Sequence, residues 1–208
     1  MARTKEAQYE DCLRAAEESG VDSLGVMTNQ VWRDDPRRLA ILLSRYKFVA
    51  KMLSGKRRLV EVGCGDAFGS RVVQQETGEL TVLDIDPGFI ADIERRMHPD
   101  WPLTPAVHDM LSGPYPGIFD AAYSLDVLEH IPQTQEETFL RNIIMSLNSD
   151  GVLIVGMPSL DSQEHASPQS KIGHINCKHG GDFKALMEGF FENVFVFSMN
   201  DEVVHTGR

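Results

Sequence analysis

The stretch Arg58-Leu59-Val60-Glu61-Val62-Gly63-Cys64-Gly65-Asp66-Ala67-Phe68-Gly69 decides the fold of this chain. Its apolar first half predicts a buried strand, and the glycines that follow predict a tight turn into a helix. Because glycine has no Cβ, the backbone N–H groups of such a turn can lie directly against a small polar ligand. Glu61 is a carboxylate inside an apolar run, so we expect it to face a donor-rich neighbour or the ligand.

Length and composition place the chain among globular proteins of one domain. It has 208 residues, 42% of them hydrophobic, a formal net charge of −11 and a pI near 5.0. This acidic balance disfavours nucleic acid and anionic membranes as partners, because both select clustered Lys and Arg. We therefore expect a small-molecule partner, with a protein as the alternative, and the sequence leaves a homo-oligomer open.

The cysteines and the N-terminal residues bear on the compartment. The three cysteines, Cys12, Cys64 and Cys177, are widely spaced and odd in number, so no disulfide framework is expected. We see no signal peptide, and no apolar run approaches the length of a membrane span. The sequence predicts a cytoplasmic protein.

From Arg58 onward, apolar strands alternate with helices. Strands are expected at residues 59–62, 80–84, 104–108, 119–125 and 151–157, and helices at 68–76, 87–97, 134–147 and 182–189. Continuous apolar strands separated by helices are typical of a parallel sheet that is covered on both faces. The pattern predicts a doubly wound α/β domain over residues 58–208, preceded by a helical segment over residues 1–57.

The N-terminal segment is expected to hold two helices, a polar one from Thr4 to Ser19 that Gly20 ends, and an amphipathic one from Asp34 to Leu53. The second helix either covers the site as a lid or simply packs on the core. Pro158 to Lys178 is a long polar stretch without periodicity, which is typical of functional or disordered loops. Two apolar runs, Phe191 to Ser198 and Glu202 to His205, predict a terminal hairpin.

Asp84 ends the second expected strand, 19 positions after Gly65. In doubly wound sheets an acid about 20 residues past the glycine turn accepts hydrogen bonds from ribose hydroxyls, so an adenosine-type ligand is indicated. The dinucleotide fingerprint would need a glycine where Phe68 stands. The acids Glu61, Asp66, Asp84 and Asp86 also favour a cationic ligand over a pyrophosphate.

Further blocks extend this pattern: His108-Asp109-Met110, Phe119-Asp120-Ala121-Ala122-Tyr123-Ser124-Leu125-Asp126-Val127-Leu128-Glu129-His130-Ile131, and Gly151-Val152-Leu153-Ile154-Val155-Gly156-Met157-Pro158. Together with the glycine turn, they resemble the class I S-adenosylmethionine (SAM) dependent methyltransferases from about Leu59 to Pro158. The resemblance implies a Rossmann-like, mostly parallel seven-stranded sheet of order 3-2-1-4-5-7-6. It also implies SAM as cofactor and S-adenosylhomocysteine as its product. The last strand, near Arg208, would be short for this family.

Carried over residue by residue, the resemblance implies a set of cofactor contacts. Gly63 and Gly65 would admit the methionine part of SAM, with Glu61 beneath it near the ammonium. Asp84 would hold the ribose, and Asp109 the adenine amino group. The full set of implied cofactor-binding residues is Glu61, Gly63, Gly65, Asp84, Ile85, Asp109, Met110, Ser124 and Leu125.

Methyl transfer depends mainly on positioning the acceptor in line with the departing sulfur. A small-molecule acceptor, a sugar or another metabolite, is expected to react at oxygen and therefore to need a base. We favour His174, because Gly173-His174-Ile175-Asn176 resembles a segment near the acceptor in small-molecule methyltransferases. His130 is expected to be structural.

The sequence leaves two other hypotheses about the function open, an NAD-type oxidoreductase and a non-catalytic SAM-binding module. A metal site is not expected. His165, His174, Cys177 and His179 share one stretch, but their spacing matches no zinc pattern.

Overall fold

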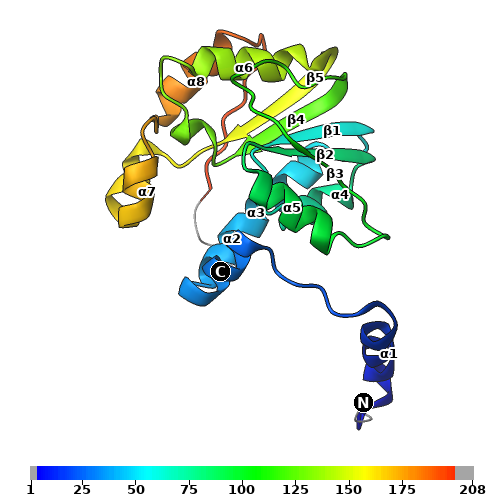
Figure 1. The fold of residues 1–208 in the computed structure, drawn as a ribbon. Coiled ribbons are helices and arrows are strands. Elements are labelled where there is room, and N and C mark those ends of the chain that lie inside the picture. The colour runs from blue at the N-terminus through cyan, green and yellow to red at the C-terminus, as the bar shows by residue number, and fades with distance from the viewer. Residues whose placement is uncertain (1–3, 200–208) are drawn as a thin grey trace, which may run out of the picture.

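Five parallel strands form one sheet in the computed structural model, which describes residues 4–199 (Figure 1). The order across the sheet is β3-β2-β1-β4-β5, so the chain winds outward from β1 in both directions. The strands are β1 (Arg58–Val62), β2 (Glu79–Asp84), β3 (Thr104–Val107), β4 (Phe119–Leu125) and β5 (Leu147–Gly156). The reversal of winding beside β1 brings the ends of β1, β2 and β4 to one edge, where ligands of such sheets bind.

Helices cover both faces of the sheet, as the alternating pattern predicts. The described helices are α1 (Glu10–Ser19), α2 (Val26–Asp34), α3 (Arg37–Met52), α4 (Ser70–Gln74), α5 (Pro87–Arg96), α6 (Glu136–Met145), α7 (Pro168–Gly173) and α8 (Gly180–Glu188), with 3₁₀ turns η1 (Ala7–Tyr9), η2 (Leu128–His130) and η3 (Leu160–His165). Figure 1 shows α3, α4 and α5 below the sheet, and α6 and α8 above it.

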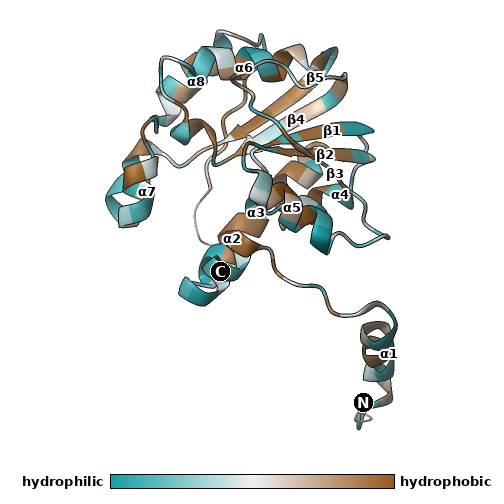
Figure 2. Cartoon of the chain, in the orientation of Figure 1, coloured by the Kyte–Doolittle hydropathy of each residue, from teal (hydrophilic) through white to brown (hydrophobic). Residues whose placement is uncertain are grey.

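The strands supply side chains to two separate cores because successive residues point to opposite faces. Leu59 of β1 packs with Tyr46 and Val49 of α3 on one face. Val60 packs with Phe139 and Leu140 of α6 on the other face. Figure 2 shows the apolar strands between these helical layers.

The sheet differs from the seven strands implied by the resemblance. Within residues 4–199 it has five strands, and Phe191 to Ser198 forms none. A strand needs a hydrogen-bonded neighbour, and its expected hairpin partner, Glu202 to His205, lies outside the described residues. Phe197 instead lies against Phe48 of α3, with the ring centroids 5.0 Å apart.

The N-terminal part contains a helix that periodicity did not reveal. α1 ends at Ser19, directly before Gly20, as predicted, and buries no residue. α2 occupies Val26–Asp34, a stretch between the two helices that the sequence predicts. α3 buries Leu39, Tyr46, Val49 and Ala50, so this helix contributes to the core. A lid role for the segment stays a prediction.

The polar stretch from Pro158 to Lys178 is more ordered than its lack of periodicity suggested. It contains η3 and α7, each of which starts at a serine cap. Ser159 Oγ accepts from Asp161 N, and Ser167 Oγ accepts from Ser170 N. No helix in the described part of the chain combines the length and apolarity needed to cross a membrane.

Candidate functional site

The glycine turn after β1 has a conformation that requires glycine. Gly63 has φ +77° and Gly65 has φ +54°, in the left-handed region. A Cβ on Gly63 would lie 2.2 Å from Cγ2 of Val127, and one on Gly65 would lie 2.8 Å from Sδ of Met27. Val127 and Met27 therefore pack directly against this turn, which we call the backbone cradle.

Asp84 lies beside this cradle at the end of β2, as the strand-end argument predicts. Its Oδ2 accepts from Gly65 N at 2.8 Å, and its Oδ1 accepts from Asp86 N at 2.9 Å. An ionised carboxylate has about four acceptor sites, so Asp84 keeps capacity for further donors. Ile85 is 70% exposed. Asp86 itself caps α5 by accepting from Gly88 N.

Glu61 lies beneath the turn, on the core side. It is 1% exposed and accepts hydrogen bonds from Tyr46 Oη at 2.7 Å, Ser70 Oγ at 2.5 Å and Tyr123 Oη at 2.7 Å. Burial raises the pKa of Glu61 to about 7, although the three hydroxyl hydrogen bonds lower it. Glu61 thus has the donor-rich neighbours that the sequence predicted. It joins α3, α4 and β4 below the glycine turn, and its contact with the cofactor stays a prediction.

The remaining sequence-predicted cofactor residues lie at the carboxyl ends of β3 and β4. Asp109 is exposed, and its Oδ1 accepts from Leu111 N at 2.8 Å. Met110 is buried in the core between the sheet and α6. Ser124 donates from Oγ to Val62 O at 2.9 Å, which ties β4 to β1 at the end of each strand. Leu125, the next residue of β4, is 9% exposed.

Backbone hydrogen bonds at the carboxyl ends of the strands hold the segments with these residues side by side. His108 N donates to Asp84 O at 2.9 Å, so the segments that carry Asp84 and Asp109 are adjacent. Gly63 N donates to Leu83 O at 2.8 Å. The structure therefore places the glycine turn beside the end of β2, and β3 beside β2, as the resemblance implied.

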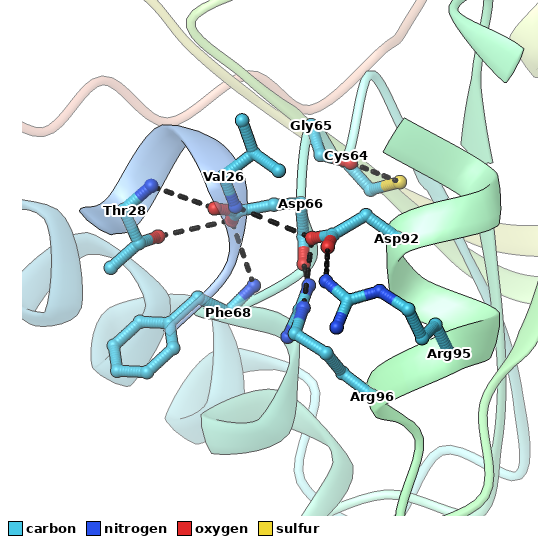
Figure 3. Close-up of polar contacts among 9 residues, drawn as sticks. All are labelled: Val26, Thr28, Cys64, Gly65, Asp66, Phe68, Asp92, Arg95 and Arg96. Atoms are coloured by element: carbon cyan, nitrogen blue, oxygen red, sulfur yellow. Dashed lines mark hydrogen bonds and ion pairs between the residues drawn. The ribbon is translucent and has the colours of Figure 1, made fainter. Parts of the chain in front are cut away.

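Sequence reasoning missed that α2 is docked on the glycine turn (Figure 3). Asp66 accepts from Thr28 N at 2.7 Å and from Thr28 Oγ1 at 3.0 Å, while Asp92 of α5 accepts from Val26 N at 3.3 Å. Since Gly25 offers no side-chain cap, these two acids serve the free N–H groups of the first turn of α2. The carboxylate of Asp66, which the sequence suggested for a cationic ligand, is thus engaged by α2.

Arginines of α5 hold this junction together. Arg96 donates to Asp92 at 2.8 Å and to Asp66 O at 2.6 Å, and Arg95 donates to Asp92 at 2.5 Å. Burial of Asp92 raises its pKa, but the hydrogen bonds from Arg96 and Arg95 outweigh this and lower the pKa below its ordinary value. Gly25, the residue before α2, has no side chain that could signal the start of this helix in the sequence.

Beyond the end of β4, two histidines face each other. The rings of His130 and His174 have centroids 5.2 Å apart. His174 Nδ1 lies 2.8 Å from Oε1 of Gln163, an acceptor, so Nδ1 carries the proton and Nε2 keeps a lone pair. Burial lowers the pKa of His174, and the nearby His130 lowers it further, so the imidazole is neutral near pH 7. The other two histidines of this region pair elsewhere, His165 with Glu164 and His179 with Asp161.

The central part of the chain is similar in sequence to known proteins. Residues 59–151 match the family described as "Methyltransferase domain". A curated relative, "Ubiquinone biosynthesis O-methyltransferase" of Xanthomonas campestris pv. campestris (strain B100), is 26% identical over 121 residues, which are 54% of this chain and 50% of the relative. The chain thus spans about half the length of the curated relatives it matches.

Two solved structures share the fold. The N-methyltransferase NodS from Bradyrhizobium japonicum WM9 has a TM-score of 0.54 and 20% identity, covering 68% of this chain and 82% of that one. The "DhpI-SAM-HEP complex" has a TM-score of 0.60 and 15% identity, covering 90% of both chains. Residues 59–151, which include the strands and the turn described above, therefore match a methyltransferase domain, and the chain shares its fold with both solved structures.

Proposed function

We propose that this chain transfers the methyl group of SAM to a hydroxyl oxygen of a small molecule, a sugar or another metabolite. The observation that carries the choice of oxygen is the neutral imidazole of His174, whose Nδ1 proton is held by Gln163. A neutral amine acceptor attacks without help, whereas a hydroxyl must lose a proton, so a base with a free lone pair favours oxygen. The O-methyltransferase named above agrees with this choice, although NodS is an N-methyltransferase.

The residues at the edge of the sheet fit SAM. The backbone cradle of Gly63 and Gly65 can lie against the methionine part, and Asp84 keeps free acceptor sites for the ribose hydroxyls. Asp109 is exposed one strand further along, where we propose that it meets the adenine. When bound, SAM supplies an electrophilic methyl group on a sulfonium, whose positive charge suits these acids better than a pyrophosphate would.

In the proposed reaction, this chain positions the acceptor and handles its proton. The acceptor oxygen forms its bond to the methyl carbon while the carbon–sulfur bond breaks and its electron pair stays on sulfur. The hydroxyl proton passes to Nε2 of His174, while the Nδ1–H of this residue keeps its hydrogen bond to Oε1 of Gln163. Because the imidazole is neutral at pH 7, it can accept this proton without a preceding deprotonation.

The test combines binding with transfer. Calorimetry is expected to show binding of SAM and S-adenosylhomocysteine but not of NAD. Labelled methyl from SAM is then followed into panels of hydroxylated metabolites and of amines. His174→Ala should keep SAM affinity and slow transfer, while His165→Ala, on an exposed side chain, should change neither.

Three results would contradict the proposal. Transfer to amines alone would overturn the choice of oxygen. Binding of SAM without transfer to any compound would favour a non-catalytic SAM-binding module. Equal loss of binding and transfer in His174→Ala would make this histidine structural.

A further inference from the structure

Three side chains with metal-ligand chemistry meet beyond the end of β4. Glu129 and His130 belong to η2, and His174 directly follows α7. One ligand atom from each residue lies within 4.8 Å of the other two. We call these residues the Glu–His–His cluster. The two segments are fixed to each other, since Ile175 N and Asn176 N both donate to Glu129 O, at 2.9 and 3.0 Å.

Glu129 is a buried carboxylate without a hydrogen bond. Its side chain is 0% exposed, and neither carboxylate oxygen has a hydrogen-bond partner among the described residues. The nearest cationic candidate, His130 Nε2, lies 3.9 Å from Oε1, which is too long for a hydrogen bond. Arg45 pairs with Asp126, and it acts on Glu129 only through its charge, without a hydrogen bond. Because an unpaired buried carboxylate is costly, this position calls for a positively charged partner.

Both imidazoles are oriented to offer Nε2. His130 Nδ1 lies 2.9 Å from Gly173 O, and His174 Nδ1 lies 2.8 Å from Gln163 Oε1. Both partners are acceptors, so each Nδ1 carries a proton and each Nε2 keeps its lone pair. Metal-binding histidines are typically held in this way, with the other ring nitrogen donating to a carbonyl or carboxylate.

We propose that Glu129, His130 and His174 bind one divalent transition-metal ion such as Zn²⁺. Two imidazoles and one carboxylate suit this class of ion better than Mg²⁺ or Ca²⁺, which prefer oxygen ligands alone. Three protein ligands with an open fourth position are also the pattern of catalytic zinc sites. Ligand atoms about 2.1 Å from one ion stand roughly 3.5 Å apart, so the side chains close inward by about 1 Å.

The proposal differs from two sequence-based expectations, that His130 is structural and that the chain has no metal site. Of the four residues that the sequence analysis considered for a metal site, His165, Cys177 and His179 lie outside the cluster. The partner of His174 is instead His130, which is distant in sequence.

The role of the ion rests on the proposed function. The open position would take the oxygen of the acceptor hydroxyl, whose pKa falls on a bound cation, so that its proton leaves to water. When the metal is bound, Nε2 of His174 coordinates the ion through its lone pair. In the metal-bound chain the ion therefore takes over the removal of the acceptor proton, which His174 performs in the metal-free chain under the proposed function.

The test measures metal binding without SAM or acceptor. The full chain, stripped with a chelator, is titrated with ZnCl₂ and separately with MgCl₂, and Co²⁺ absorption reports the ligand set. We expect one Zn²⁺ per chain and much weaker Mg²⁺ binding. Glu129→Gln and His174→Ala should each weaken Zn²⁺ binding at least 100-fold. Gln163→Ala, which removes only the orienting amide, should weaken it about tenfold. His165→Ala is the matched histidine control and should bind as the wild type does.

Two outcomes overturn the site: no stoichiometric Zn²⁺ binding, or equal affinity in Glu129→Gln, His174→Ala and the wild type. Circular dichroism and SAM calorimetry on each variant show whether the protein still folds. SAM binding and metal binding are separate measurements. A chain that binds Zn²⁺ without transferring methyl groups would contradict the proposed function alone, and a chain that transfers them but binds no Zn²⁺ would contradict the metal site alone.

Discussion

Glu61 should make the stability of the protein depend on pH. Its carboxyl group is enclosed by three hydroxyls, and burial raises its pKa from 4.5 to about 7. Between these two pH values the folded state holds a proton that the unfolded state has released. The free energy of unfolding therefore falls as the pH rises through this window.

The size of this effect follows from the two pKa values. At 1.36 kcal/mol for each tenfold change, the wild type should lose about 3 kcal/mol through Glu61 between pH 4.5 and 7. The Glu61→Gln variant has no carboxyl group at this position, so its free energy of unfolding should lack this part of the pH dependence. Glu129, whose pKa burial also raises to about 7, contributes equally to both proteins and cancels in their difference.

Urea denaturation at pH 5, 6, 7 and 8 measures this difference. Glu79→Gln, at a carboxylate that is 82% exposed, is the matched control and should keep the wild-type slope. If Glu61→Gln follows the same pH profile as the wild type, the carboxyl group is not held protonated by burial and the reasoning fails.

Three further predictions concern the glycine turn. Asp84→Ala should weaken SAM binding more than tenfold by calorimetry, since the ribose would lose a charged acceptor, and an unchanged Kd would remove Asp84 from the site. Asp66→Ala should lower the free energy of unfolding by about 1–3 kcal/mol, because the buried N–H and hydroxyl of Thr28 lose their hydrogen-bond acceptor. A decrease below about 0.5 kcal/mol, which is the size expected for a neutral surface substitution, would contradict this. Gly63→Ala should cost clearly more in urea denaturation than Gly55→Ala, which has φ +80° but no atom within 4 Å of the added Cβ, and equal costs would show that the turn relaxes freely.

Sequence reasoning worked where the relevant signal was local. The apolar run before Gly63 defined β1, and the spacing to Asp84 correctly placed that acid beside Gly65. Both follow from strand length and from the geometry of parallel strands, which hardly depend on distant residues.

Long-range contacts could not be predicted in this way. α2 starts without a capping side chain of its own, and its caps are Asp66 and Asp92, which lie 38 and 66 positions from the N–H groups they accept. Neither residue stands where a capping pattern would place it. Similarly, His130 and His174 are brought together only because the chain after α7 returns to the carbonyl of Glu129.

The prediction of two further strands at the far edge of the sheet was wrong for another reason. The resemblance implied two more strands beyond β5, but Phe191 to Ser198 has no paired neighbour within residues 4–199. Apolar alternation shows that a segment suits a strand, and it does not show which backbone will pair with it.

The first turn of α2 is capped by Asp66 and Asp92, which lie outside this helix, so the fluorescence of Trp32 on α2 can report on the glycine turn. A nine-residue helix is too short to persist alone in water, so α2 depends on its attachment to the glycine turn and α5. Trp32 lies on this helix and is 56% exposed. Any rearrangement of the turn that releases Asp66 would therefore change the surroundings of this indole, and in a Trp101→Phe background intrinsic emission would follow the turn without an added label.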